Sequence, residues 1–196
     1  EPTDGSSDGD ADGDVDADSD ADTDADGDAD ADSDVSTDCG GRDDMVFLEA
    51  VGVCIDRYEA SAGTGSEAVS AVGVMPWVEV NWSSASSACE AAGKRLCTFA
   101  EWSSACAGPS GTSYPYGNEF ETGRCHDASF DNEAVLATGS FATCEGGYPG
   151  IFDINGNAWE WTSTLQGERY LIGGGSFKNG DEEMLCTASD DVGGGY

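Results

Sequence analysis

The chain has 196 residues, of which 40 are acidic and seven are Lys or Arg, so its formal net charge at pH 7 is −33. Nucleic acid is thereby excluded as a partner, because phosphate binding needs clustered Lys and Arg. No stretch approaches the roughly 18 consecutive apolar residues of a membrane span. Glu1 in place of Met indicates a removed leader, and anchoring upstream of the chain, through a lipid or a signal peptide, stays an open alternative.

Residues 1–44 are predicted to form a disordered, Asp-rich tether. They contain 19 of the 40 acidic residues and one base, Arg42. From Asp8 to Asp34 every even position is Asp, so an extended chain carries these carboxylates on one side, where they repel one another. The segment has too little apolar surface to offset the entropy of ordering, and we expect a solvated spacer that holds the next domain off a surface.

Calcium binding is the alternative role for this tether. Asp8–Gly13 and Asp22–Gly27 match the first half of an EF-hand loop. Position twelve of the two loops is Ser19 or Ser33 instead of a bidentate Glu, and no amphipathic helix flanks them. We therefore expect weak, delocalised cation binding rather than a structured calcium repeat.

A globular domain is predicted over residues 45–196. It begins with residues 45–55, an apolar run between acidic residues, which predicts one or two buried strands. Gly and Ser then dominate to about residue 73, and residues 76–80 are predicted to be extended.

A helix is predicted to begin at Asn81 or Ser83 and to stop at Gly93. Ala and Cys recur within it at helical spacing, which predicts that this face is buried. They stand at Ala85, Ala88, Cys89 and Ala92.

A second helix is predicted from Thr98 to about Gly108, because Thr98 and Glu101 form a capping-box pattern. From residue 109 onward Gly, Pro, Asn and aromatic residues alternate without a helical period. Loops and short strands are predicted there, with disulfides substituting for regular structure.

The eight cysteines form no C-x-x-C pair of the kind that holds zinc, and seven of them follow residue 44. An even number of cysteines without the spacing of a metal site favours disulfides, and disulfides persist in oxidising compartments. We expect an extracytoplasmic protein of a bacterium: secreted, periplasmic or at the cell surface.

Seven spaced motifs match, in order, those of the formylglycine-generating-enzyme (sulfatase-modifying factor) family. They are Cys54–Glu59, Trp82–Cys89, Gly93–Leu96, Thr98–Trp102, Tyr114–Gly117, Asn155–Thr162 and Gly174–Phe177. The chain resembles this family over about residues 45–191. The resemblance implies an α+β, C-type-lectin-like fold with little regular structure, in which two helices pack on short twisted sheets.

Catalytic members of this family resemble one another in two cysteines just beyond the Gly-Gly-Ser motif, which bind copper as thiolates and use oxygen to convert a substrate cysteine to formylglycine. In this chain Asn179 stands at the first position and residues 181–183 replace the second. Their oxygens are hard ligands that hold Cu(I) poorly. We expect no catalytic residue and no copper. A divergent copper- and oxygen-dependent oxidoreductase acting on a cysteine of a sulfatase-like substrate is the alternative.

The resemblance implies a structural calcium in residues 153–160. Asp153 and Glu160 would supply side-chain oxygens, and Gly156 and Ala158 backbone carbonyls; all are the hard donors that calcium takes. The alternative is a Gly-Asn turn without metal that leads into a Trp-rich core strand. The histidine-bound iron of another branch of the family needs more than the one histidine here, His126, for which we expect an exposed or hydrogen-bonded side chain.

The cysteines suggest a framework of three disulfides. Its pairs are Cys106–Cys186, which the resemblance implies, then Cys125–Cys144 and Cys54–Cys97. Cys39 and Cys89 remain, and the position that usually pairs with Cys89 in the family lies beyond the point where this sequence stops. Either the C-terminus is truncated, or Cys89 pairs with Cys39 or stays free.

The leading hypothesis is a non-catalytic binding module that presents the loops around residues 110–145 and 173–191 to an unidentified extracellular ligand or protein. The competing hypothesis is the oxidoreductase. An oxidase needs two accessible thiols close together, whereas a binding module should have every cysteine locked in a disulfide.

Overall fold

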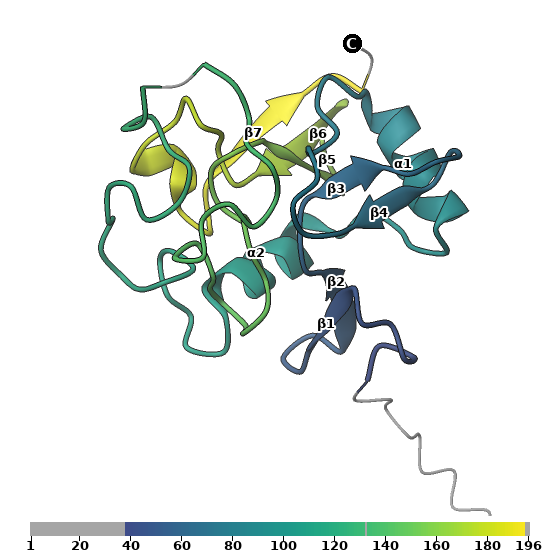
Figure 1. The fold of residues 1–196 in the computed structure, drawn as a ribbon, viewed down its shortest axis with the longest axis horizontal. Helices are drawn as coiled ribbons and strands as arrows, with labels where there is room; N and C mark the ends of the chain where they lie inside the picture. The colour runs from purple at the N-terminus through teal and green to yellow at the C-terminus, as the bar shows by residue number, and fades with distance from the viewer. Residues whose placement is uncertain (1–37, 132, 195–196) are drawn as a thin grey trace, which may run out of the picture. The chain divides into compact units, whose positions relative to one another are not determined.

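The computed structural model describes residues 38–131 and 133–194, so most of the predicted tether, residues 1–37, lies outside the described residues. In chain order the elements are β1 (Met45–Leu48), β2 (Val53–Asp56), β3 (Ala60–Ala62), β4 (Ala68–Ser70), α1 (Trp82–Ala91), α2 (Phe99–Ala107), β5 (Glu160–Gln166), β6 (Arg169–Gly173), the 3-10 helix η1 (Glu182–Met184) and β7 (Ser189–Val192). The predicted α+β class with little regular structure is confirmed (Figure 1).

The apolar run after residue 44 forms two strands, β1 and β2, which pair antiparallel with Met45 opposite Asp56. A turn at Cys39, in which the Arg42 N–H donates to the Cys39 carbonyl, folds the chain back toward β2. Cys39 thereby forms a disulfide with Cys54. The predicted Cys54–Cys97 pair is wrong, because Cys97 remains a free thiol that packs against the core.

Residues 42–44 are bonded to the domain by charged side chains. The Lys94 ammonium is almost fully buried and forms ion pairs with Asp44, at 2.7 Å, and with Asp56. Arg42 donates to the Ala92 carbonyl, at 3.1 Å, where α1 ends. These contacts fix the segment before β1 to α1.

The first helix begins where the sequence predicts. The Asn81 side chain accepts from the Ser84 N–H at 2.9 Å, which caps the first turn of α1. Gly93 follows the helix in the left-handed region, with φ of 69°, as expected of a stop residue. Of the predicted apolar face Ala88 is fully buried, and Cys89 is half-buried.

The second helix carries the predicted capping box: Thr98 Oγ1 accepts from the Glu101 N–H, and the Glu101 carboxylate accepts from the Thr98 N–H. Trp102 of α2 is 2% exposed and packs on the sheet. A Cβ added at Gly173 of β6 would lie 2.8 Å from the Trp102 ring, so only glycine permits this close approach.

Glu101 gives α2 a pH-dependent contribution to stability. The hydrogen bonds from Arg95 chiefly, and those from Thr98, lower the pKa of Glu101 from 4.5 to about 2. A lowered carboxyl pKa stabilises the fold above the unfolded value and loses that effect as the pH falls toward the folded value. We expect Glu101→Gln to lower the free energy of unfolding by about 1 kcal/mol at neutral pH, and the difference to shrink as the pH falls from 4.5 toward 2.

Urea unfolding across this pH range measures the effect. Glu90→Gln is the matched control, because Glu90 is exposed at the end of α1 and its carboxylate accepts one hydrogen bond among the described residues, from the Ser86 hydroxyl. A Glu101 difference that persists unchanged at the acidic end would contradict the assigned cause.

The remaining strands form a β3–β4 hairpin and a three-stranded antiparallel sheet in the order β5–β6–β7. The long loops of residues 109–131 and 133–159 lie together with η1 on one side of the domain, and α1, β3 and β4 lie on the other (Figure 1). No helix in the described ranges is long and apolar enough to span a membrane. The packing predicted for the family, helices on short sheets, is present, since α2 contacts β5 and β6 and α1 contacts β4.

Candidate functional site

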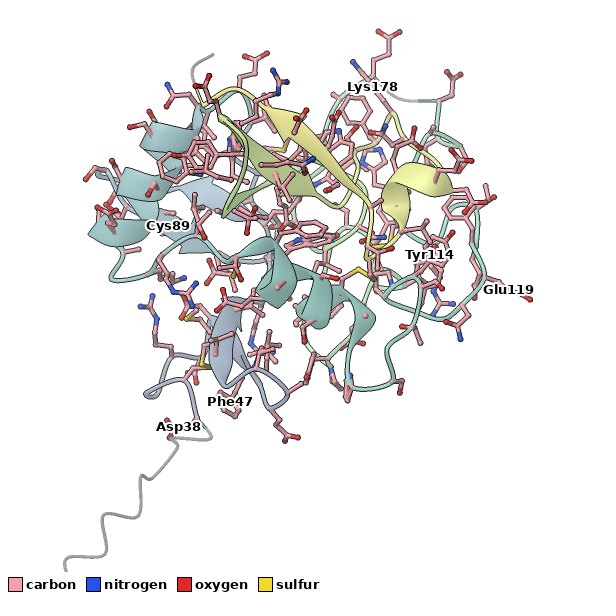
Figure 2. All side chains as sticks on the ribbon, turned by 180° about the vertical axis from the view of Figure 1, so that it is seen from behind. Asp38, Phe47, Cys89, Tyr114, Glu119 and Lys178 are labelled. Atoms are coloured by element: carbon pink, nitrogen blue, oxygen red, sulfur yellow. A yellow bond between two sulfur atoms is a disulfide. The ribbon has the colours of Figure 1, made fainter. Side chains whose placement is uncertain are left out.

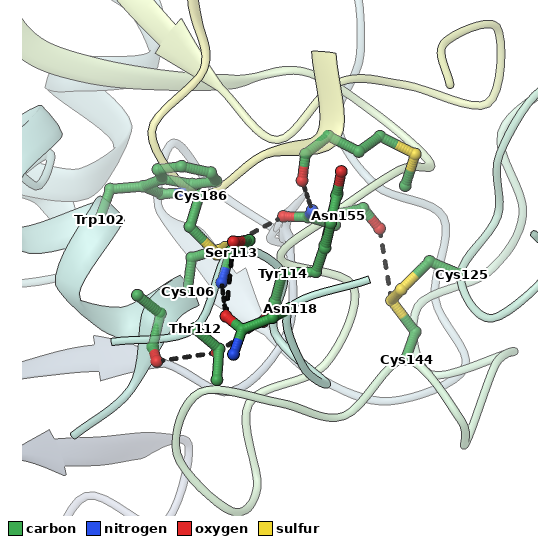
Figure 3. The surroundings of a disulfide bond; sticks show 12 residues. Trp102, Cys106, Thr112, Ser113, Tyr114, Asn118, Cys125, Cys144, Asn155 and Cys186 are labelled. Atoms are coloured by element: carbon green, nitrogen blue, oxygen red, sulfur yellow. Dashed lines mark hydrogen bonds between the residues drawn. A yellow bond between two sulfur atoms is a disulfide. The ribbon is translucent and has the colours of Figure 1, made fainter. Parts of the chain in front are cut away.

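The C-terminal loop, defined here as residues 174–186, is held to α2 by a disulfide between Cys106 and Cys186, which confirms that predicted pair. Both cysteines are 0% exposed. The predicted Cys125–Cys144 pair is also confirmed. Figure 3 shows Asn155 between the two disulfides, with its side-chain oxygen 3.2 Å from the Cys106 sulfur and its backbone oxygen 3.3 Å from the Cys144 sulfur.

Asn179 and residues 181–183, which the family resemblance sets at the positions of the copper cysteines, carry side-chain oxygens. Asn179 Oδ1 accepts from both the N–H and the hydroxyl of Ser176, at 3.0 and 2.6 Å. The Tyr114 hydroxyl donates to the Asp181 carboxylate. Burial, together with this hydrogen bond, raises the pKa of Tyr114 to about 12, so the phenol keeps its proton and remains a donor.

The two loop regions predicted to present a ligand-binding surface adjoin each other. The Ala128 N–H donates to the Asn179 carbonyl at 2.9 Å, and the Cys186 N–H donates to the Ser113 carbonyl at 2.8 Å. Figure 2 shows Tyr114, Glu119 and Lys178 on this side and Cys89 on the opposite side. Exposed carboxylates dominate the surface, notably Glu119, Glu121, Asp181, Glu182 and Glu183.

His126 lies under this surface, 2% exposed, with its Nδ1 3.0 Å from Asn157 Oδ1. Its ring stacks with Phe141 and Phe177 at centroid distances of 5.6 Å. The predicted hydrogen-bonded histidine is confirmed. Across the described part of the chain, no three His, Cys, Asp or Glu side chains form a group that could hold a metal ion.

The four residues predicted to hold calcium lie in the loop that leads into β5. Asp153 is 4% exposed, and its Oδ2 accepts from the Gly139 N–H at 2.5 Å. Glu160 Oε2 accepts from the Trp102 indole N–H at 2.9 Å. Within the described residues, no hydrogen bond ends on the carbonyl oxygen of Gly156 or Ala158, so both remain available as donors to a cation.

Asp153 and Glu160 each accept a hydrogen bond, and His126 interacts electrostatically with Asp153. No Lys or Arg of the described residues forms an ion pair with Asp153 or Glu160. Burial raises the pKa of Asp153. Burial, with added repulsion from Asp153, raises the pKa of Glu160 to about 8. Carboxylate and carbonyl oxygens are the hard donors that calcium takes, and a bound cation would favour the ionised form of both carboxyl groups.

Glu59 is a further acidic residue beside residues 157–158. It ends the motif Cys54–Glu59, but no sequence pattern predicted it as a site residue. It is 7% exposed, and its carboxylate accepts from the Asn157 side chain at 2.5 Å and from the Ala158 N–H at 2.9 Å. Burial, with repulsion from Glu160, raises its pKa. Glu59 therefore joins Asn157 and Ala158 to the chain just after β2.

A cleft of about 640 Å³ lies between β2, α1 and β5. Ala158 and Glu160 belong to its wall, whereas Asp153 and Gly156 do not. The free cysteines of the described residues, Cys89 and Cys97, both line it. The expectation that every cysteine is locked in a disulfide is therefore wrong.

These two thiols are poor nucleophiles. Burial raises the pKa of Cys97 to about 12, and burial, with repulsion from Asp56, also raises the pKa of Cys89. Both thiols stay protonated near neutral pH, and the thiolate is the form that binds metal and attacks disulfides.

Residues 38–194 match the family model of the sulfatase-modifying factor enzyme 1-like domain. Among curated proteins, the "Inactive C-alpha-formylglycine-generating enzyme 2" of Mus musculus is 33% identical over 100 residues, which is 46% of this chain and 32% of that protein. The "Formylglycine-generating enzyme" of Bos taurus is 37% identical over 100 residues, 45% of this chain and 26% of that protein.

A third relative is the "Serine/threonine-protein kinase pkn1" of Chlamydia pneumoniae, 31% identical over 136 residues, 66% of this chain and 20% of that protein. The chain thus spans a third or less of these relatives. Among solved structures, PvdO from Pseudomonas aeruginosa aligns with a TM-score of 0.52 and 15% identity, over 72% of this chain and 75% of that one. This likeness shows the fold alone.

Proposed function

The chain belongs to the family of sulfatase-modifying factor enzyme 1-like domains, and from that premise we propose that it is a non-catalytic binding module of an extracytoplasmic protein. One observation carries the proposal. Cys186, the cysteine of the C-terminal loop, is bonded to Cys106, and the resemblance places Asn179 and residues 181–183 at the positions of the copper cysteines of catalytic members. A relative whose name calls it inactive is compatible with this role.

Thiol counting tests the proposal directly. The oxidised, calcium-treated chain is alkylated at neutral pH and its intact mass is measured, then disulfides are mapped in the digest. We expect little alkylation while the chain is folded and two alkylated thiols, Cys89 and Cys97, after unfolding, because burial keeps both protonated. Added Cu(I) should change neither result.

The alternative is a copper- and oxygen-dependent oxidoreductase acting on a cysteine of a sulfatase-like substrate. The shared position of Cys89 and Cys97 on one cleft is the observation in its favour. Rapid alkylation of both thiols in the folded chain, protection by Cu(I) and copper-dependent oxygen uptake would together overturn the binding-module proposal. A double variant, Cys89→Ser with Cys97→Ser, should then abolish the oxygen uptake.

The proposed ligand is an extracellular molecule or protein that contacts the loops around residues 110–145 and 173–191. Hydrogen bonds between these loops support a single continuous surface. Its exposed carboxylates favour a basic partner, because opposite charges steer association. Three disulfides support an oxidising location: secreted, periplasmic or at a bacterial surface. Of the Asp-rich residues 1–44, those ahead of Cys39 would serve as the spacer, because Cys39 and Asp44 are bonded to the domain.

We propose a structural calcium held by Asp153, Gly156, Ala158 and Glu160. Two features of the described residues support it: no hydrogen bond ends on the carbonyl oxygens of Gly156 and Ala158, and no Lys or Arg pairs with Asp153 or Glu160. Calcium at about 100 times its dissociation constant should raise the free energy of unfolding by about 2.7 kcal/mol, and Asp153→Asn should remove most of that gain. Chemical unfolding with calcium or with a chelator measures both.

Asp127→Asn is the matched control, because Asp127 is another buried carboxyl, 2% exposed, whose hydrogen bonds are to Gly123 and Ser129. The control should leave the calcium gain intact. A gain that survives Asp153→Asn undiminished would place the ion elsewhere, and no gain at millimolar calcium would argue for the turn without metal.

A further inference from the structure

The C-terminal loop contains an Asn-Gly pair, Asn179 and Gly180, which Asp181 separates from η1. Glycine offers no side chain to shield its backbone nitrogen from the carboxamide of the residue before it. A Cβ added at Gly180 would meet no atom within 4 Å. The peptide nitrogen of Gly180 is therefore open on the side where a side chain would stand.

Neighbouring groups are placed to assist a reaction between this nitrogen and the Asn179 carboxamide. Asn179 Oδ1 accepts two hydrogen bonds from Ser176, from its N–H at 3.0 Å and its hydroxyl at 2.6 Å. The Gly180 N–H donates to Glu183 Oε2 at 3.4 Å. A nucleophile beside a proton acceptor, and a carbonyl oxygen beside two donors, are the elements of acyl transfer.

We propose that Asn179–Gly180 is a site of self-modification, in which the Asn179 amide is converted to aspartate or isoaspartate. Glu183 accepts the proton of the Gly180 N–H, and the nitrogen forms a bond to Asn179 Cγ. The two Ser176 donors stabilise the negative charge that develops on Oδ1. The Cγ–Nδ2 bond then breaks, and the amide nitrogen takes up the proton and leaves as ammonia.

The product of this step is a five-membered succinimide. Water opens the ring at one of its two carbonyls, so that the net change is Asn plus water to aspartate or isoaspartate plus ammonia. Either product adds one negative charge beside Asp181. The isoaspartate form also routes the backbone through the side-chain carbon, which changes the course of the loop before η1.

The chain contains an internal contrast in a second Asn-Gly pair, Asn155 and Gly156. Asn155 is 0% exposed and donates its amide to the Met184 carbonyl. The Gly156 N–H donates to the Gly174 carbonyl at 2.8 Å, which cannot serve as a base. A Cβ at Gly156 would lie 2.4 Å from the His126 carbonyl, so this pair is enclosed and should remain unmodified.

The inference goes beyond the proposed binding function and does not depend on it. The full chain is incubated at neutral pH and physiological temperature, and the 179 and 155 peptides are followed by mass spectrometry for the exchange of NH2 for OH, with isoaspartate separated by chromatography. The same chain unfolded in denaturant, with its disulfides intact, gives the reference rate. We expect conversion at Asn179 at or above the reference rate and none at Asn155.

Three variants test the assigned groups. Glu183→Gln and Ser176→Ala should each slow the conversion in the folded chain about tenfold, with no effect in the unfolded chain. Gly180→Ala should slow it at least as much in both states, and the space around Gly180 indicates that it folds normally. Gly193→Ala, at another glycine with no atom within 4 Å of an added Cβ, is the control and should leave the rate unchanged.

Two outcomes overturn the proposal. Conversion at Asn179 that is much slower in the folded than in the unfolded chain would mean that the loop protects the amide. Acceleration in Ser176→Ala, or an unchanged rate in Glu183→Gln, would mean that these residues only restrain Asn179 and take no part in the reaction.

Discussion

Removing the Cys106–Cys186 disulfide is expected to lower the free energy of unfolding by about 4 kcal/mol. The bond joins residues separated by 80 positions, and a cross-link over a long loop restricts the unfolded chain most. Both half-cystines are 0% exposed and lie in the core beside Trp102. Urea unfolding of a Cys106→Ala/Cys186→Ala double variant measures the loss.

Two controls distinguish the stability lost with the cross-link from the stability lost with the cysteine side chains. A Cys89→Ala/Cys97→Ala variant removes two free thiols without removing a bond, and should cost much less. Removing Cys125–Cys144, which spans 19 positions, should cost about 3 kcal/mol. Equal losses for the cross-linked and the free pair would contradict this account.

Replacing Lys94 by Met is expected to cost about 3 kcal/mol. The Lys94 side chain is 5% exposed and contacts two carboxylates, Asp44 and Asp56. Burial opposes ionisation of Asp44, yet hydrogen bonds from Lys94 and Arg42 hold its pKa at about 2. Burial raises the pKa of Asp56. Without Lys94, the carboxylates of Asp44 and Asp56 would lose the cation that they share. Removing one partner of a buried ion pair leaves the other charge without compensation, which is costly.

Arg169→Met is the matched control for this loss. Arg169 pairs with Asp191 at 3.1 Å, but the two side chains are 53% and 41% exposed, and exposed pairs contribute about 1 kcal/mol or less. Thermal and urea unfolding of both variants compare the two sites. A Lys94 variant no less stable than the Arg169 variant would show that the Lys94 ion pairs do not stabilise the fold.

The Lys94 network also bears on the display role proposed for the domain. Lys94 and the Cys39–Cys54 disulfide join residues 39–44 to β2 and α1. A pull on the chain ahead of Cys39 would therefore reach β2 directly through the disulfide. This arrangement suits a domain that is held by its N-terminal end.

The amino-acid sequence by itself predicted the elements that local interactions decide. The Thr98–Glu101 capping box and the Asn81 cap lie within four residues of their partners, so side-chain type and spacing suffice. For residues 45–55 the apolar run left one or two strands open, and the structure forms two, β1 and β2. The α+β class and the Cys106–Cys186 bond were implied by the family resemblance, which rests on seven motifs in the same order. Hydrophobic periodicity alone could not have predicted either one.

Only the tertiary structure decided the contacts between distant segments. Cys39 lies beside Cys54 because a turn folds it back, and Cys97 packs against the core instead. Glu59 meets Asn157 and Ala158 almost a hundred residues away, and the cleft forms where β2, α1 and β5 approach. No local sequence pattern predicts these contacts, because they form only when the whole chain packs around one hydrophobic core.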